Sequence, residues 1–149
     1  MVMGFNHSGI VVKDLQKMIA FYTETLGMKV DREVDSVAPP EGDHTGFPGA
    51  KRKLVFVSFP DGDHSMELVH YINPPSPAGG LEKHQVNASH ICFNVKDLQA
   101  FYDKTSKGVI RYVTPPKFRN IAGGVRVGIV YGYDPEGNLM EFMERTKTA

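Results

Sequence analysis

The chain repeats a five-residue segment, and this repeat limits the folds that it can adopt. Residues 12–16, Val-Lys-Asp-Leu-Gln, recur as residues 95–99, and a histidine, His7 or His90, stands five positions before each copy. A second pair of segments also matches: Pro60-Asp61-Gly62 leads to Met66-Glu67-Leu68, and Pro135-Glu136-Gly137 leads to Met140-Glu141-Phe142. Matched segments in the same order indicate one structural unit written twice. Because units of about 70 residues are marginal alone, we expect the two to pack together, within one chain or between two.

Each copy has the pattern of a strand, a helix and three further strands. Asp14 and Asp97 are predicted helix caps, and Gly27 and Gly108 are predicted helix ends. The predicted strands are 5–12, 28–34, 53–59 and 65–72 in the first copy, and 88–95, 109–114, 125–131 and 139–143 in the second. Residues 36–50 and 115–124 are predicted to be loops that could close over a site. The fold class is therefore α+β, a single domain 1–149 with modules 5–72 and 88–144 and a linker, 73–87.

The composition excludes several classes of function. Lys plus Arg and Asp plus Glu number 17 each, so the net charge is zero, which argues against a nucleic-acid or membrane-surface binder. The one cysteine, Cys92, cannot form an internal disulfide and fits a reducing compartment. Its strand pattern predicts that it is buried and not a nucleophile. With no signal segment and no long apolar run, we expect a cytoplasmic protein. The partners that we expect are a small-molecule substrate and, because the two modules could pair across a dimer, a second copy of the chain in a homodimer.

Two histidines and two glutamates stand at equivalent places in the repeat. Strand alternation places His7 and His90 on the side of each sheet that faces away from the helix, and the same holds for Glu67 and Glu141. A carboxylate in an otherwise apolar strand is costly to bury unless it is paired or bound to a cation. Imidazole and carboxylate groups converging on one face are typical of a divalent-metal site.

Each of these residues also has an ordinary explanation. His7 could be a simple polar residue near the N-terminus, and Glu67 could lie on a solvated face. Glu141 could pair with Arg126 or Arg111 across strands. The duplication of the His and Glu pairs favours the metal site over these separate explanations.

The same residues resemble the vicinal oxygen chelate superfamily, which includes glyoxalase I, methylmalonyl-CoA epimerase, extradiol dioxygenases and bleomycin-binding proteins. The matching stretches are His7-Ser8-Gly9-Ile10-Val11-Val12-Lys13-Asp14-Leu15, Phe21-Tyr22, Leu26-Gly27-Met28, Met66-Glu67-Leu68, His90-Ile91-Cys92-Phe93-Asn94-Val95 and Asp134-Pro135-Glu136-Gly137-Asn138-Leu139-Met140-Glu141-Phe142. The resemblance implies paired βαβββ modules in an open, curved, barrel-like mixed sheet with helices outside. It also implies one divalent ion (Ni, Co, Zn, Mn or Fe) with His7, Glu67, His90 and Glu141 as ligands.

The four-ligand set is similar to glyoxalase I and to the epimerase. We therefore expect a metal-dependent lyase or isomerase of the glyoxalase I-like type, with proton transfer through a metal-bound enediolate on a small carbonyl or thioester substrate. Glu141, or else Glu67, would be the catalytic base. An epimerase-like racemase is an alternative, because Val11 stands where bacterial glyoxalase I-like enzymes tend to carry an arginine. An extradiol dioxygenase, typically with two His and one Glu, and a non-catalytic binding protein are further alternatives.

Overall fold

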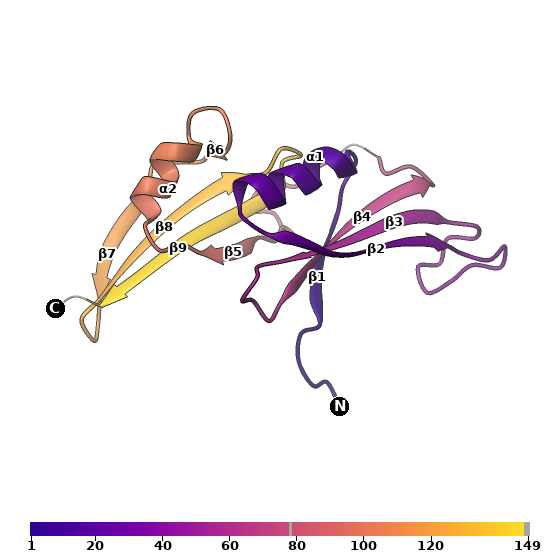
Figure 1. Ribbon diagram of the computed structural model, residues 1–149, viewed down its shortest axis with the longest axis horizontal. Helices are drawn as coiled ribbons and strands as arrows, with labels where there is room; N and C mark the ends of the chain where they lie inside the picture. Colours follow the sequence, from indigo (N-terminus) through magenta and orange to yellow (C-terminus); the bar gives the residue numbers. More distant parts are fainter. Residues whose placement is uncertain (78, 148–149) are drawn as a thin grey trace. The chain divides into compact units, whose positions relative to one another are not determined.

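The computed structural model describes residues 1–77 and 79–147 of the chain. The chain divides into two compact units, Met1–Ala78 and Gly79–Ala149. Each unit contains its own mixed sheet and its own helix (Figure 1). None of the helices in the described ranges is both long and apolar enough to cross a membrane.

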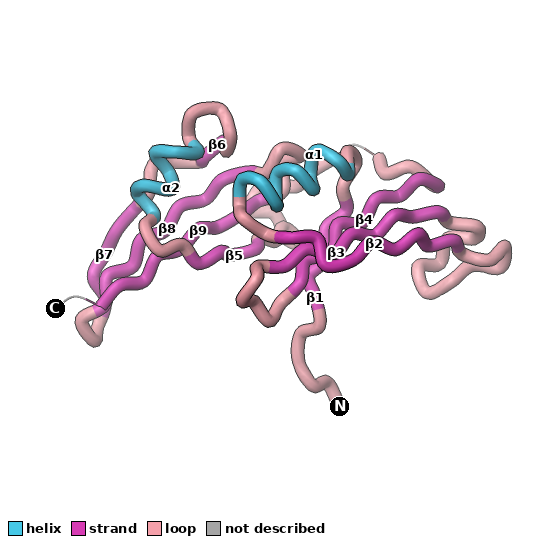
Figure 2. Tube along the Cα trace, in the orientation of Figure 1, coloured by secondary structure: helices cyan, strands magenta, loops and turns pink. Residues whose placement is uncertain are grey.

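The first unit is a four-stranded sheet with a helical segment after its first strand. Its elements are β1 (His7–Val11), α1 (Leu15–Ala20), the π-helical turn η1 (Phe21–Thr25), β2 (Lys29–Val37), β3 (Lys51–Ser58) and β4 (Ser65–Asn73). The strand order is β1-β4-β3-β2, in which β1 runs parallel to β4 and the other pairs are antiparallel. Figure 2 shows how short the helical part is beside the strands.

The helix begins and ends where the sequence predicts, but it is not one α-helix. The Asp14 carboxylate accepts a hydrogen bond from the Lys17 amide at 3.1 Å, as an N-cap does. From Phe21 the turn widens, and the Leu26 amide donates to the Phe21 carbonyl at 3.4 Å, five residues back. Gly27, with φ of +80°, ends the segment.

One face of the first sheet forms the core of this unit. Val55 and Val57 on β3 and Leu68 on β4 are fully buried, and α1 packs against β4. Residues that alternate with them, such as Phe56 and Glu67, lie on the opposite face. This second face of the sheet carries the predicted site residues of the unit.

The second unit repeats the plan with a broken edge strand. Its elements are β5 (Ile91–Asn94), α2 (Leu98–Thr105), β6 (Arg111–Tyr112), β7 (Lys117–Ile121), β8 (Val125–Tyr133) and β9 (Leu139–Lys147). The strand order is β5-β9-β8-β6, and β7 also pairs with β8; only β5 and β9 are parallel. The α+β class and the βαβββ order predicted from the sequence are confirmed.

The predicted loop 115–124 is wrong, because it contains β7. β6 and β7 pair with successive parts of β8, so together they act as one edge strand interrupted at Pro115 and Pro116. Proline has no amide hydrogen to donate to a ladder, which explains the break after the predicted strand 109–114. That strand is also shorter at its start, because the amides of Val109 and Ile110 donate to the Thr105 carbonyl at the end of α2. Gly128 on β8 leaves room for the Phe118 ring, which holds β7 in place.

Three smaller predictions also need correction. The strand predicted over 88–95 covers only Ile91–Asn94, so His90 precedes it. Strand β2 continues to Val37, which shortens the first predicted loop to 38–50. Cys92 is exposed instead of buried, because the buried face of β5 is the one that carries Phe93.

Candidate metal-binding site

The first unit brings His7 and Glu67 together. Nε2 of His7 lies 3.3 Å from Oε2 of Glu67. The pair comes from adjacent parallel strands, with Gly9 opposite Glu67 in the register. Gly9 matters here because a Cβ at this position would approach Glu67 Oε2 at 3.4 Å. The His7 ring meets the Phe56 ring edge to face, with centroids 5.5 Å apart, so an aromatic side chain forms one wall of the pair.

The second unit brings His90 and Glu141 together in the same way. Nε2 of His90 lies 2.9 Å from Oε2 of Glu141, and the Glu141 side chain is only 9% exposed. The His90 ring meets the Tyr131 ring edge to face at 5.2 Å. Tyr131 also donates a hydrogen bond from its hydroxyl to Glu141 Oε2 at 3.3 Å. The carboxylate is thus bordered by an imidazole and a phenol.

The two aromatic residues occupy equivalent positions that sequence reasoning missed. Phe56 lies directly opposite Glu67 across the β3–β4 pair, and Tyr131 lies directly opposite Glu141 across β8–β9. The signal that could have found them is the hairpin register, since each Pro-x-Gly turn fixes which residue faces the glutamate. The difference between them is the hydroxyl, which only the second unit provides.

The spacing within each pair suits two ligands of one metal ion. Nitrogen and oxygen ligands bind zinc-like ions at about 2.0–2.2 Å, which places neighbouring ligand atoms roughly 2.8–3.6 Å apart, from octahedral to tetrahedral geometry. The observed 2.9 and 3.3 Å are close to that separation. They would also suit a hydrogen bond between imidazole and carboxylate. Over the ranges that the structure describes, no three or more His, Cys, Asp or Glu residues are grouped to hold a metal, so each unit supplies a pair.

The surroundings of Glu141 keep two neighbouring acids neutral. Partial burial raises the pKa of the Tyr131 phenol, and the Glu141 carboxylate raises it further. Partial burial, and then the same carboxylate, raise the pKa of the Cys92 thiol to about 11. At neutral pH the phenol therefore keeps its proton and donates a hydrogen bond to Glu141. The Cys92 thiol is not activated, which agrees with the expectation that it is not a nucleophile.

The alternative partners considered for Glu141 are wrong. The guanidinium of Arg126 lies over the Phe118 ring at 4.1 Å, and that of Arg111 lies over the Tyr133 ring at 4.0 Å. Glu141 instead pairs with His90.

The histidines that do not repeat have other partners. His64 Nε2 is hydrogen-bonded to Ser8 Oγ at 2.9 Å, and His70 Nδ1 donates to the Val12 carbonyl at 3.2 Å. The side chain of His44 is 83% exposed. The recorded partners of His64, His70 and His44 are Ser8, Val12 and Asp43, and none of them is His7 or Glu67.

The loop 38–50 is fastened to the sheet face that carries His7 and Glu67. The buried Arg52 guanidinium pairs with the Asp43 carboxylate of the loop, and it donates to Ser36 Oγ at 2.8 Å. The Phe47 ring of the loop meets the Tyr71 ring at 6.1 Å. The register places Arg52 opposite Tyr71, on the same face as Phe56. The loop therefore closes one end of this face.

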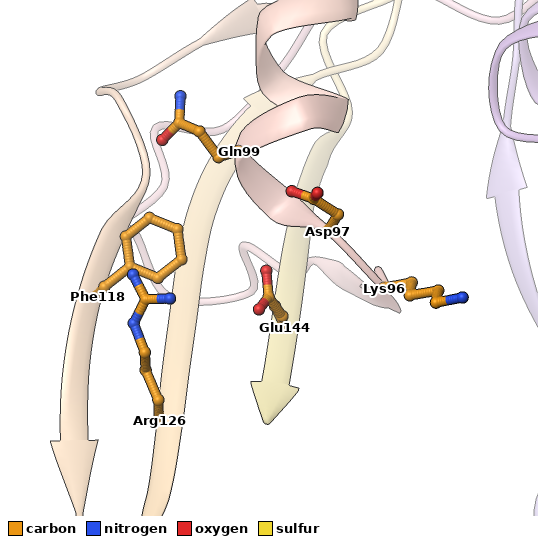
Figure 3. Close-up of a pocket in the computed structure, with 6 residues that line it drawn as sticks. All are labelled: Lys96, Asp97, Gln99, Phe118, Arg126 and Glu144. Carbon is orange, nitrogen blue, oxygen red and sulfur yellow. The ribbon is translucent and has the colours of Figure 1, made fainter. Parts of the chain in front are cut away.

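A separate pocket of about 440 Å³ lies on the helix side of the second unit. Its lining residues are Lys96, Asp97, Gln99, Phe118, Arg126 and Glu144 (Figure 3). Both acids already support the helix, because Glu144 accepts from the Leu98 amide at 2.7 Å and Asp97 accepts from the Ala100 amide at 3.0 Å. The charges of this pocket are balanced, and its acids serve the helix N-terminus.

Comparisons with known proteins agree with this architecture. Residues 4–142 match the Glyoxalase/Bleomycin resistance protein/Dioxygenase superfamily. The chain is 32% identical to an ethylmalonyl-CoA/methylmalonyl-CoA epimerase of Cereibacter sphaeroides, over 95% of this chain and 97% of that one. It is 27% identical to a lactoylglutathione lyase of Haemophilus influenzae, over 95% and 93%. A glyoxalase family protein from Bacillus cereus shares the fold, with a TM-score of 0.81, 20% identity, and 97% and 95% of the two chains covered. The chain therefore belongs to the glyoxalase/bleomycin resistance protein/dioxygenase superfamily.

Proposed function

We propose that this protein is a metal-dependent lyase or isomerase of the glyoxalase I-like type, acting on a small carbonyl or thioester substrate. The observation that carries the proposal is the pair of matched His–Glu contacts, 3.3 Å in one unit and 2.9 Å in the other. Similarity to one protein named as an epimerase and to another named as a lyase supports the proposal.

The proposed ligands of the ion are His7, Glu67, His90 and Glu141. Two imidazole nitrogens and two carboxylate oxygens suit a divalent ion of the Ni, Co, Zn, Mn or Fe group. When bound, such an ion supplies Lewis-acid stabilisation of negative charge on a substrate oxygen, an effect of several kcal/mol.

The glutamates are the proposed groups for proton transfer. We assign Glu141 as the group that takes a proton from the carbon beside the substrate carbonyl and returns it to a neighbouring atom, with Glu67 as the other candidate. The Tyr131 hydroxyl fixes the orientation of the Glu141 carboxylate through the 3.3 Å hydrogen bond. Glu67 faces Phe56, which has no hydroxyl to do the same.

An epimerase-like racemase is the second candidate. Val11 stands where bacterial glyoxalase I-like enzymes tend to carry an arginine, and it is half exposed on β1. The 32% identity to an ethylmalonyl-CoA/methylmalonyl-CoA epimerase also favours this candidate. The two candidates share proton removal beside a carbonyl and differ in the substrate. A homodimer and a cytoplasmic location stay predictions from the sequence.

Deuterium exchange tests the shared step. The protein, reconstituted with each of the five metals, is incubated in D₂O with methylmalonyl-CoA or with the hemithioacetal of methylglyoxal and glutathione. We expect metal-dependent incorporation of deuterium at the substrate carbon with one of the two, and its loss in His7→Ala/His90→Ala. His84→Ala, in the exposed segment that precedes β5, is the control that keeps activity.

Two results would overturn this proposal. Oxygen consumption with a catechol, without proton exchange, would assign a ring-cleaving dioxygenase. Absence of metal uptake and of exchange in the wild-type protein would leave a small-molecule binding protein.

A further inference from the structure

The sheet face that carries Glu141 becomes cationic along the strands. Residues directly opposite each other in a sheet share a face, and here the pairs continue from Glu141 and Tyr131 in two further rows. The first row is Met143, Ile129 and Lys117, and the second row is Arg145, Val127 and Arg119. The face therefore gains three positive charges within two rows.

A cavity of about 270 Å³ lies over the β7 and β8 members of these rows, and Arg145 on β9 stands outside its lining. Its lining residues are Lys117, Phe118, Arg119, Val127 and Ile129. Val127 is 4% exposed and forms an apolar floor, whereas Lys117 and Arg119 are exposed at the rim. An apolar floor with a cationic rim suits a ligand that has an apolar stem and an anionic end.

Among the described residues, no carboxylate pairs with any of the three cations. In the ranges 1–77 and 79–147, none of Lys117, Arg119 and Arg145 forms an ion pair. Glu144, next to Arg145 in sequence, lies on the opposite face, where it accepts from the Leu98 amide. Lys117 and Arg119 stand two residues apart on β7, and Arg145 lies on β9, with β8 between the two strands. Like charges on one face repel each other, and a bound anion would relieve that repulsion. The helix-side pocket differs because two acids balance its two bases.

The strand spacing sets how far the cations lie from the proposed reaction site. Ile129 and Val127 lie two and four residues along β8 from Tyr131, which faces Glu141. At about 3.4 Å per residue, these steps are roughly 7 and 14 Å along the strand. A single elongated molecule can therefore span both places.

We infer that Lys117, Arg119 and Arg145 form a subsite for the phosphate or carboxylate group of an amphipathic substrate, about 7–14 Å from the carbon that reacts beside Glu141. The distance of 7–14 Å to the reacting carbon rests on the proposed function, because it takes Glu141 as the base. Binding of the anion to the subsite does not depend on that function. The substrate class is thus an elongated carbonyl compound with an apolar stem and an anionic end.

Calorimetry with small probes tests the subsite without turnover. Hexyl phosphate, hexanoate and 1-hexanol are titrated into the full chain, and the first two distinguish a phosphate from a carboxylate ligand. We expect one or both anions to bind, 1-hexanol to bind at least tenfold more weakly, and binding to weaken as salt rises. Lys117→Gln/Arg119→Gln should lose tenfold or more in anion affinity, because hydrogen bonds to charged groups are the strong ones.

A matched control removes two charges from the other face of the same unit. Lys96→Gln/Lys104→Gln, at exposed positions before α2 and within it, has the same net charge as the test variant. It should bind the anions within about twofold of wild type, as long-range charge effects are screened. Equal weakening in both variants, or no anion binding by wild type, would overturn the subsite. If the anion binds as expected and no metal-dependent deuterium exchange is found, the subsite stands and the proposed function fails.

Discussion

Arg52 is a single buried cation that holds a long loop in place. It is 4% exposed, and its guanidinium pairs with Asp43 and donates to Ser36. A buried charge is costly unless it is paired, so the loop 38–50 must bring Asp43 to this point. Hydrogen bonds from the Thr45 hydroxyl and amide, and then the charge of Arg52, hold the pKa of Asp43 below its usual value of 3.8.

This lowered pKa predicts an acid-sensitive loop. A carboxyl whose folded pKa lies below its unfolded value stabilises the fold above the unfolded value, and that stabilisation is lost as pH falls through the folded value. We expect Asp43→Asn to lower the free energy of unfolding at pH 7 and to flatten its decline below about pH 5. Urea unfolding between pH 3 and pH 8 measures both effects. Asp63→Asn, in the exposed turn before β4, is the control, and an unchanged acid decline in Asp43→Asn would contradict the assignment.

At the same scale, one hydroxyl distinguishes the two His–Glu pairs. Tyr131 donates to Glu141, whereas Phe56 faces Glu67 with a ring alone. Otherwise the pairs match in atoms, distances and edge-to-face rings. The duplication therefore extends from the His–Glu pairs to the aromatic residue beside each of them, and only Glu141 accepts a hydrogen bond from that residue.

At the scale of elements, the broken edge strand of the second unit depends on one glycine. A Cβ at Gly128 would lie 2.5 Å from Cε1 of Phe118 and 3.1 Å from Cδ2 of Leu98. Real side chains do not approach so closely, so Phe118 and β7 would have to move. Leu98 belongs to α2, so the same glycine also leaves room for the packing of α2 on the sheet.

We expect Gly128→Ala to destabilise the protein by about 1–3 kcal/mol, the usual cost of overpacking. Urea unfolding measures the cost, and hydrogen exchange should show loss of protection at the amides of 117–121.

In a Phe118→Ala background the same change should cost at least 0.5 kcal/mol less, because the two sites are in contact. Gly79→Ala, which meets nothing within 4 Å, should stay within about 0.5 kcal/mol of wild type. Full protection of 117–121 in Gly128→Ala would contradict this role of the glycine.

At the scale of the whole molecule, the repeat gives each unit a sheet, a helix and one His–Glu pair. The pairs lie in different units, and their union around one ion stays a prediction. If one ion takes ligands from both pairs, then either histidine should be needed for metal binding. A substitution of the histidine in one unit would then lower the metal affinity of the whole protein.

The stability of the protein with and without metal tests that dependence. A ligand that binds only the folded state stabilises it by about 2.7 kcal/mol at a hundredfold excess over its dissociation constant. We expect His7→Ala and His90→Ala each to abolish most of the rise in thermal midpoint that the metal causes. His44→Ala, whose side chain is 83% exposed, should keep it. If His7→Ala kept the full rise, the second unit would bind the metal alone.

The sequence by itself determined the repeat, the face of each strand and the identities of the two His–Glu pairs. These follow from local periodicity, because alternate residues of a strand must point to opposite faces. Only the tertiary structure decided what depends on contacts between distant segments. Pairing with β8 makes 117–121 a strand, the hairpin register brings Tyr131 to Glu141, and Asp43 reaches Arg52. Such contacts depend on which strands pair and in what register. Of these three, only the Tyr131–Glu141 pairing has a local signal, the Pro-x-Gly turn of its hairpin.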